Sequence, residues 1–456
     1  NHLLDLPRGF SYRVLETVGS DMDDGYRVPG LPDGMACFEP GDGTLVLMRN
    51  HELAAGDRDT PYHRGQSPPP EAVDPTSPGG VTRLVLDEKT LTRTSSNLVL
   101  VGTVRNCAGG LSPWGWLSCE ETLQDGHGYV YLCDPKANAV QPGRKIAGYG
   151  RFNHEAATVD PQTLVAYLTE DRPTSAFYRF VPARNDDPFA GRLQALAISG
   201  ARGLDTSSAL TVGVPVEIEW VDVGSPDPRT DGVGEAARAA GAAIVRRGEG
   251  LWLHEGSVFF SATAGGPAAR GQIFRIEPRG DGGTLELIAE ASADNALDFP
   301  DNISVSPAGG IVIAEDGAGD NYLRGLDEAG RVFDFARSAH ERTELAGVCF
   351  APSGRALFVN MQQAGRTLVI EGPLEEVFGA PPSPSPPTTP ARADGAPPAQ
   401  SSRADGSEPS GAEQGCGCRT TPSPDLSPIP VGAALTALAL RGREQGGENW
   451  RRRRAR

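Results

Sequence analysis

Short apolar or alternating runs, separated by glycine, proline, asparagine and aspartate, fill the chain from about residue 8 to residue 371. Period-two alternation bordered by turn residues is typical of β-strands. An exception is the alanine-rich stretch 235–245, which predicts one short helix. The pattern therefore predicts an all-β fold built from many short strands, with runs at 44–48, 98–101, 129–132, 177–181 and 216–220.

A diverged repeat is visible when three segments are compared. Residues 155–171, 301–316 and 345–361 each read as a strand, a proline-containing turn and a second strand. The last two are offset by 45 residues, from Val305 to Phe350, and a similar hairpin at 252–260 lies about 50 residues earlier. A period of this size is typical of a β-propeller blade. With hairpins at 44–48 and 114–121 the pattern predicts a six-bladed β-propeller. A seven-bladed propeller is the alternative, because the interval 159–253 shows no clear repeat unit.

Composition and charge narrow the function classes. The chain of 456 residues has 57 Gly and 39 Pro but only 4 Met, which favours tight turns and excludes a helical bundle. Its net charge is −17, and the last sixteen residues hold seven Arg and two Glu, so the remainder carries −22. This balance disfavours nucleic acid as a partner. It suits hard cations such as Ca²⁺.

The seven cysteines are too few and too unevenly spaced for a disulfide scaffold, and no CxxC pair indicates a zinc ribbon. The chain starts with Asn1 and shows no positively charged segment followed by an apolar one. Either a targeting segment has been removed or the sequence is truncated. The cysteines alone leave the redox compartment open.

The C-terminal region differs from the rest. We expect a propeller over 1–372, a linker over 373–415, disordered because 381–414 is Pro-rich and nearly free of large apolar residues, and a sorting or anchor segment over 416–456. The order of Cys416 and Cys418, an apolar run at 431–440 and four arginines at 451–454 resembles the C-terminal sorting tag of myxobacterial surface proteins. Ten apolar residues are short of the ~20 that span a bilayer. Membrane association through this tail is one expectation, and an ordinary disordered tail is the other.

The densest group of reactive residues lies at 105–121. A thiolate from Cys107 or Cys119 beside Glu120 and Glu121 offers one soft and several hard donors, a mixture that binds a transition metal beside Ca²⁺. Because neighbouring strand residues point to opposite faces, only one of the two glutamates faces the axial channel. The alternative is a buried free cysteine beside a solvated glutamate pair.

Acids recur after the second strand of several repeats, as Glu120-Glu121, Glu170-Asp171 and Glu315-Asp316. Equivalent positions of several blades converge on one end of the channel, where repulsion between carboxylates is costly unless cations lie between them. A metal cluster relieves that repulsion. Four further residues fit the same site: Glu52, Glu155, Asp301 and Asn302. We expect the neighbouring His51 and His154 to be hydrogen-bonded at strand ends rather than bound to metal.

The segments NCAGG…SPWGWLSCEE, GRFNHEA, TEDRPTSAFYRFVP, FPDNISVSPAGGIVIAEDG and ELAGVCFAPSGRALFVNMQQAGRTLVIEGP resemble the PhoX-type alkaline phosphatases, in the shorter branch of that family, over about residues 5–372. The resemblance implies a six-bladed propeller with two ferric ions (Fe³⁺) and calcium ions on its axis. It also implies export to the periplasm or cell surface through a twin-arginine signal. It implies Cys107 as the iron thiolate and Glu121 and Glu155 as iron or calcium ligands. Further ligands carried over by the resemblance are Asp171, Asp301, Glu315 and Asp316.

The expected reaction is hydrolysis of a small phosphomonoester by a monomeric enzyme, since clustered cations activate water and neutralise phosphate. Arg172 is the first choice for a guanidinium that binds phosphate oxygens, with Arg105 the second. Each arginine has an alternative role as a partner of neighbouring acids. Two other classes remain: a calcium-dependent propeller hydrolase of the lactonase type, which needs only oxygen ligands, and a non-catalytic surface propeller whose acids form structural calcium sites.

Overall fold

The computed structural model describes residues 3–327, 330–339 and 342–379. The chain divides into a compact unit, Asn1–Pro386, and a second unit, Pro387–Arg456. The second unit lies outside the described residues, as do the expected sorting segment and the expected linker from residue 380 onward. Within the described residues no helix is both long and apolar enough to cross a membrane.

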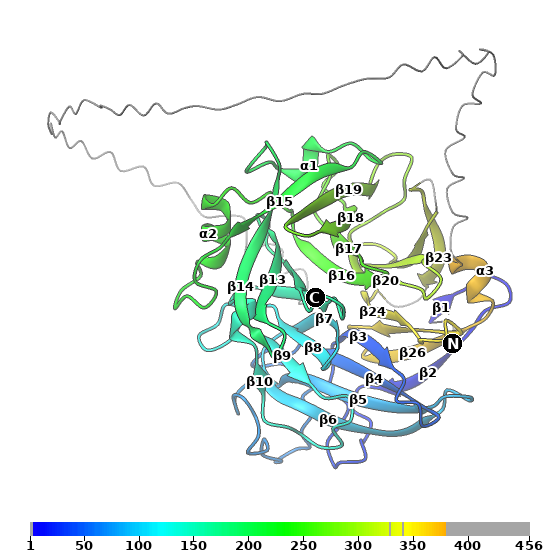
Figure 1. The fold of residues 1–456 in the computed structure, drawn as a ribbon. Coiled ribbons are helices and arrows are strands. Elements are labelled where there is room, and N and C mark those ends of the chain that lie inside the picture. Colours follow the sequence, from blue (N-terminus) through cyan, green and yellow to red (C-terminus); the bar gives the residue numbers. More distant parts are fainter. Residues whose placement is uncertain (1–2, 328–329, 340–341, 380–456) are drawn as a thin grey trace, which may run out of the picture. The chain divides into compact units, whose positions relative to one another are not determined.

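The described residues form five antiparallel sheets, one of which has nine strands and comprises two blades, so that six four-stranded units follow one another around a common axis from blue to gold in Figure 1. Each is a blade, and its strand named first lies innermost. Blade 1 consists of β3 (Pro32–Phe38), β4 (Thr44–His51), β5 (Gly79–Asp87) and β6 (Arg93–Thr103). Blade 2 consists of β7 (Asn106–Ser112), β8 (Gly115–Glu120), β9 (Val130–Cys133) and β10 (Arg144–Lys145). Blade 3 consists of β11 (His154–Val159), β12 (Ala166–Glu170), β13 (Phe177–Arg184) and β14 (Asp187–Ile198).

The other three blades repeat the arrangement. Blade 4 consists of β16 (Gly248–His254), β17 (Ser257–Ala262), β18 (Gln272–Arg279) and β19 (Gly282–Glu290). Blade 5 consists of β20 (Pro300–Val305), β21 (Ile311–Glu315), β22 (Tyr322–Leu326) and β23 (Val332–Ser338), to which β1 (Leu4–Asp5) adds an edge. Blade 6 consists of β24 (Leu345–Phe350), β25 (Ala356–Met361), β26 (Arg366–Glu371) and β2 (Ser11–Thr17).

The innermost strands close a ring. Each of β3, β7, β11, β16, β20 and β24 contacts the next, and β24 contacts β3. The N-terminal strand β2 pairs with β26 and so joins the first part of the chain to the last blade. An extra strand, β15 (Val216–Asp222), pairs with both β14 and β19 and links blades 3 and 4 at their outer edges. The predicted six-bladed propeller is confirmed.

The hydrophobic core lies between adjacent sheets, where the two facing surfaces interdigitate. Phe177 of blade 3 and Phe260 of blade 4, for example, have ring centroids 4.6 Å apart and both are buried. The core is therefore divided among the interfaces between neighbouring blades.

Helices are few and short within the described residues: η1 (Ala147–Tyr149), α1 (Thr206–Ala209), α2 (Val233–Ala239) and α3 (Leu374–Phe378). The predicted helix at 235–245 is α2, which begins two residues earlier and ends at Ala239, before Gly241 adopts a φ of 91°. Helix α3 follows the expected propeller boundary at 372, and its Leu374 and Phe378 are buried in the core beside blade 6. The folded part of the chain therefore extends beyond the expected start of the linker at 373.

Candidate metal centre

A β-bulge interrupts each innermost strand near its first residue. In blade 2, Asn106 pairs with Glu120 and Gly109 with Ser118, so two residues lie opposite one. A bulge bends the strand and redirects a side chain, and bulges are common next to functional sites. The first bulge residues of blades 1 to 6 are Asp33, Cys107, Glu155, Glu249, Asp301 and Gly347. Five blades thus offer an acid or a thiol at one equivalent position.

In blade 6 the residue that corresponds to these ligands in sequence spacing is Ala346, and the bulge begins one residue later, at Gly347. Gly347 has a φ of 59°, in the left-handed region that favours glycine. A Cβ atom on Gly347 would lie 2.1 Å from the backbone oxygen of Asp33. Only glycine therefore lets blade 6 approach blade 1 where the ring closes.

A second set of side chains lies where the second strand of each blade ends. In every blade the backbone N–H at this point donates to the carbonyl just before the innermost strand, at 2.9–3.2 Å. The donors are Glu52, Glu121, Asp171, Thr263, Asp316 and Gln362, and the acceptors are Leu31, Arg105, Asn153, Arg247, Phe299 and Glu344. Four of the acceptors, Leu31, Arg105, Arg247 and Phe299, have φ of 44–55°. Such backbone costs of order 1–3 kcal/mol per residue and clusters at functional sites.

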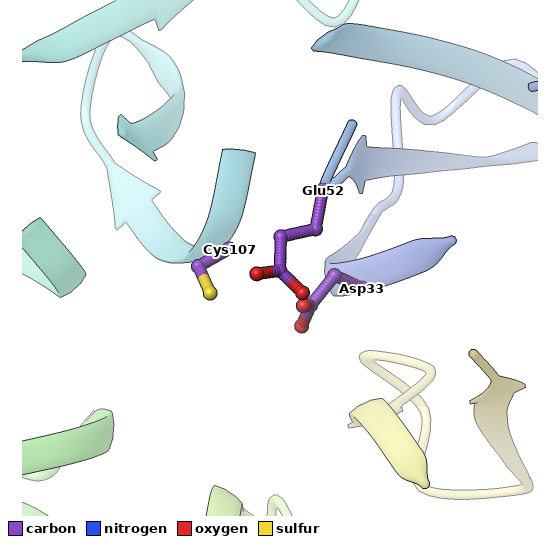
Figure 2. Close-up of side chains that lie close together, drawn as sticks. All are labelled: Asp33, Glu52 and Cys107. Atoms are coloured by element: carbon purple, nitrogen blue, oxygen red, sulfur yellow. The ribbon is translucent and has the colours of Figure 1, made fainter. Parts of the chain in front are cut away.

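Members of the two sets, together with Glu344, form a cluster of eight residues, called here the axial cluster. It consists of four triads, and within each triad the three ligand atoms lie within 4.8 Å of one another. The triads are Asp33–Glu52–Cys107, Cys107–Glu121–Glu155, Glu155–Glu249–Asp301 and Asp33–Asp301–Glu344. Neighbouring triads share one residue, and each shared residue is the first residue of a bulge. Figure 2 shows the first triad, in which Asp33 extends from β3, Cys107 from β7 and Glu52 from the residue after β4, with their side chains close together.

Two arginines lie at the edge of the axial cluster. The guanidinium of Arg105 contacts both Glu52, at 2.5 Å, and Glu121. The guanidinium of Arg247 lies 2.7 Å from Asp171 and 2.8 Å from Glu249. Their side chains are 35% and 24% exposed, so both remain accessible from solvent.

The cluster is strongly unfavourable when its acids are all ionised. Burial raises the pKa of Glu155, Glu249 and Asp301 well above the usual range, and the negative charges of neighbouring carboxylates raise it further. Burial and nearby carboxylates also raise the pKa of the Cys107 thiol. Burial raises the pKa of Glu121 to about 7, although Arg105 opposes the shift. Seven carboxylates face only two guanidinia, so bound cations fit this donor set better than two arginines do.

The structure brings most of the predicted site residues together. Cys107, Glu52, Glu121, Glu155 and Asp301 belong to the axial cluster. Asp171 lies at its edge on Arg247, and the negative charge of Asp316 helps to raise the pKa of Asp301.

Two predicted positions need correction. The expectation that Glu315 faces the channel is wrong, because alternate strand residues point to opposite faces and its carboxylate binds Arg324, at 2.8 Å, instead. Arg172 forms an ion pair with Asp231 outside the axial cluster, with 37% of its side chain exposed.

The neighbouring polar residues behave as expected of structural groups. The ring of His51 contacts the Gly30 oxygen at 2.9 Å and the Thr82 hydroxyl at 2.8 Å, and the ring of His154 contacts the Gly150 oxygen at 2.9 Å. Glu120 points away from the axis and binds His127. The prediction that only one residue of the Glu120-Glu121 pair faces the channel is confirmed.

Sequence reasoning missed Asp33, Glu249, Glu344 and Arg247. Part of the signal was present: Leu31-Pro32-Asp33 repeats the form of Phe299-Pro300-Asp301, with an apolar residue in left-handed backbone, a proline and then the ligand. Arg247-Gly-Glu249 likewise repeats the spacing of Arg105-Asn-Cys107.

Comparison with known proteins agrees with this architecture. The sequence matches the alkaline phosphatase PhoX family over residues 1–98 and 89–365. No curated protein matches the chain in sequence. In structure the chain is similar to PhoX of Pseudomonas fluorescens, solved in complex with the transition state analogue vanadate, with a TM-score of 0.64 and 19% identity over 83% of this chain and 97% of that one. A gluconolactonase from Xanthomonas campestris has a TM-score of 0.43 and 13% identity over 79% of this chain and 95% of that one.

The solved PhoX shares the fold of this chain, and the family match covers most of its length, including the residues of the axial cluster. The chain belongs to the alkaline phosphatase PhoX family and is a phosphomonoester hydrolase.

Proposed function

We propose that the axial cluster holds iron and calcium ions and is the centre at which this chain hydrolyses phosphomonoesters. The observation that carries the proposal is the chain of four triads that share their bulge residues. A single structural ion needs one triad. Four linked triads provide for several ions close together, which is the arrangement that neutralises a phosphate and its attacking oxygen at once.

The donor atoms divide the triads into two kinds. Two triads contain Cys107, whose thiolate is a soft ligand, and two consist of carboxylates alone. Soft sulfur beside carboxylate suits a transition metal, whereas all-oxygen sites suit calcium. We therefore place iron with Cys107, Glu52 and Glu121, and calcium with Glu249 and Glu344. Asp33, Glu155 and Asp301 complete these sites and connect them.

Bound cations would lower the pKa of water and withdraw negative charge from the phosphate. The protein's own contribution is position and charge. Arg105 and Arg247 lie on the solvent side of the axial cluster, where planar guanidinium groups suit the oxygens of a phosphate. The acids Asp171 and Glu121 hold these guanidinia in place before substrate arrives. We propose Arg105 and Arg247, rather than Arg172, as the groups that bind the phosphate.

A cavity of about 980 Å³ between blades 1 and 2 is a less suitable reaction site. It is lined by Phe38 and Ser112, the last residues of β3 and β7, whereas the axial cluster lies at the first residues of these strands. None of the eight cluster residues lines this cavity. Its volume would accept a ligand, but its walls lack a metal triad.

The two other function classes differ from the proposal in what they require. A lactonase-type hydrolase with calcium needs oxygen ligands only, and a non-catalytic propeller needs only structural ions. Neither explains why a buried thiol belongs to two of the four triads. The position of Cys107 therefore favours the iron-containing phosphatase.

The test is elemental analysis of the purified protein together with assays of p-nitrophenyl phosphate and a lactone substrate. We expect iron and calcium in the protein, and hydrolysis of the phosphate that stops with EGTA and returns with calcium. Stoichiometric zinc without iron would contradict the metal assignment. Lactone hydrolysis without phosphate hydrolysis would contradict the proposed reaction.

A further inference from the structure

The bulges that carry the proposed ligands leave a structural problem that the chain must solve. A bulge residue falls out of the strand ladder, so its backbone carbonyl loses its usual partner. Buried carbonyls without a partner cost free energy, and nearly all of them in proteins are hydrogen-bonded. Here the carbonyls belong to residues whose side chains form the axial cluster.

Four buried polar side chains bond these carbonyls, and each comes from the preceding blade. Asn50 donates to the Cys107 oxygen at 3.0 Å and to the Ala108 oxygen at 2.6 Å. Three more bonds of the same kind run from Thr169 to the Glu249 oxygen at 2.6 Å, from Ser261 to the Asp301 oxygen at 2.8 Å and from Asn360 to the Asp33 oxygen at 2.6 Å. All four donors are at most 1% exposed.

The position of these donors follows from the register. Asn50, Thr169 and Ser261 are the residues that lie opposite the bulge of their own blade, and Asn360 lies one residue further along its strand. All four donors keep regular pairing with the third strand of their blade, so the backbone fixes the place from which each side chain crosses to the next blade. The second strand of one blade therefore supplies the group that fixes the ligand of the neighbouring blade.

Thr169 connects two proposed ligands at once. Its hydroxyl donates a hydrogen bond to the backbone oxygen of Glu249 in blade 4. The same hydroxyl accepts a hydrogen bond from the N–H of Ala156, the residue after Glu155 in its own blade. Glu155, Glu249 and Asp301 form one of the all-carboxylate triads. A shift in this hydroxyl would move two ligands of that triad.

We infer that Asn50, Thr169, Ser261 and Asn360 are positioning residues that set the geometry of the axial cluster from one blade to the next. The inference rests on the proposed function of the cluster as a metal centre. Residues that orient metal ligands through one intermediate contact affect metal affinity even though they never touch the ion. Their hydrogen bonds therefore govern how tightly the ions are held, beyond any contribution to folding.

The test uses Thr169→Val, which keeps the branched shape and loses the hydroxyl, and Thr169→Ser, which keeps the hydroxyl. The purified holoenzyme of each variant is titrated with EGTA, and bound calcium and iron are measured. We expect Thr169→Val to lose half its calcium at an EGTA concentration about 10- to 100-fold lower than the wild type requires. Thr169→Ser should restore wild-type retention.

The matched control is Thr206→Val. Thr206 is a buried threonine whose hydroxyl donates to the Ile244 oxygen at 2.9 Å, at the start of α1 and outside the axial cluster. We expect this variant to lose stability but to retain its metals. Ser261→Ala, compared with Ser261→Thr, repeats the test with a second hydroxyl and decides the matter if Thr169→Val does not fold.

Wild-type retention of calcium in the variants that lack the hydroxyl would overturn the inference. So would equal losses in Thr169→Ser and Thr169→Val, because only the hydroxyl distinguishes positioning from packing. A wild-type protein without iron or calcium would contradict the proposed function itself, and the inference would fall with it.

Discussion

Cys107 and Glu155 occupy the same position in neighbouring blades, the first residue of a β-bulge, and belong to one triad that Glu121 completes. The fold thus presents a thiol and a carboxylate to a common centre through the same kind of β-bulge. Glu155 belongs to two triads, one that contains Cys107 and one that consists of carboxylates alone. The chemical difference between these two triads arises from the residue type at the first position of the bulge.

Replacement of Cys107 by serine tests the assignment of iron. Serine fits the space but is a poor ligand for iron, so we expect most of the iron to be lost. Activity should fall by about 100-fold or more, because even the loss of an indirect ligand contact lowers metal affinity or activity by about 10- to 100-fold. Calcium in the all-carboxylate triads should be retained. Metal content and p-nitrophenyl phosphate hydrolysis measure both effects.

Cys133→Ser is the matched control for Cys107→Ser. Cys133 is buried among apolar residues and belongs to no triad among the described residues. Its replacement should lower stability and leave iron bound. Equal loss of iron in the two variants would show that sulfur at Cys107 has only a structural role.

The proposed phosphate-binding role distinguishes Arg247 from Arg172. Arg247→Gln removes a guanidinium that contacts the edge of the axial cluster, and loss of one donor to a developing charge typically lowers kcat by about 100-fold or more. Arg172→Gln removes an exposed ion pair and should change kcat by about twofold at most. The measurements are kcat, KM and inhibition by inorganic phosphate, with metal content checked in each variant. Arg172→Gln as damaging as Arg247→Gln would return the role to Arg172.

The fold could be predicted because its repeat is visible in the order of strands and turns along the sequence. Each blade repeats a strand, a turn with proline or glycine and a second strand, and alternation survives in the buried strands. The boundary at 372 was less accurate because the short run Leu374–Phe378 resembles linker sequence in length, and only its packing against blade 6 shows that it belongs to the fold.

The site was predictable where acids follow a strand in pairs, as at Glu120-Glu121 and Glu170-Asp171. Of the ligands that a bulge supplies, Cys107, Glu155 and Asp301 were predicted from their motifs, whereas Asp33 and Glu249 were missed. A bulge breaks the period of two, so Asp33 and Glu249 fall outside any alternating pattern, and their convergence depends on contacts between blades far apart in sequence. Glu315 was wrongly predicted because its sequence neighbours match those of the other acids, whereas its side chain lies on the opposite face of its strand.

A histidine away from the axial cluster should make stability depend on pH. The hydrogen bond to Glu120, at 2.7 Å, raises the pKa of His127 above its ordinary value of 6.5, although burial opposes the shift, and Asp74 adds to it. Because the pKa of His127 is raised in the folded state, protonation of its ring stabilises the protein. This contribution is fully present below about pH 6.5 and is lost as the pH rises through the folded-state pKa. Urea unfolding between about pH 5 and pH 9 should show the loss, and His127→Gln should remove it. A wild-type minus variant difference that stays constant with pH would contradict this prediction.

Two truncations decide where the folded unit ends. A chain that stops at Gly379 keeps α3, whereas one that stops at Pro373 loses Leu374 and Phe378, both 2% exposed. The ring of Phe378 packs on Phe335 with centroids 4.9 Å apart, and its carbonyl accepts the Ser306 hydroxyl at 2.6 Å. Loss of two buried side chains of this size should lower the free energy of unfolding by about 3 kcal/mol or more. Phe378 binds Ser306, which follows the last residue of β20, whereas Asp301 of the axial cluster lies near the first residue of that strand. Metal content should therefore be equal in both truncations while the midpoint of urea unfolding differs. Equal midpoints would place the end of the stabilising core at 372, as the composition of the chain first indicated.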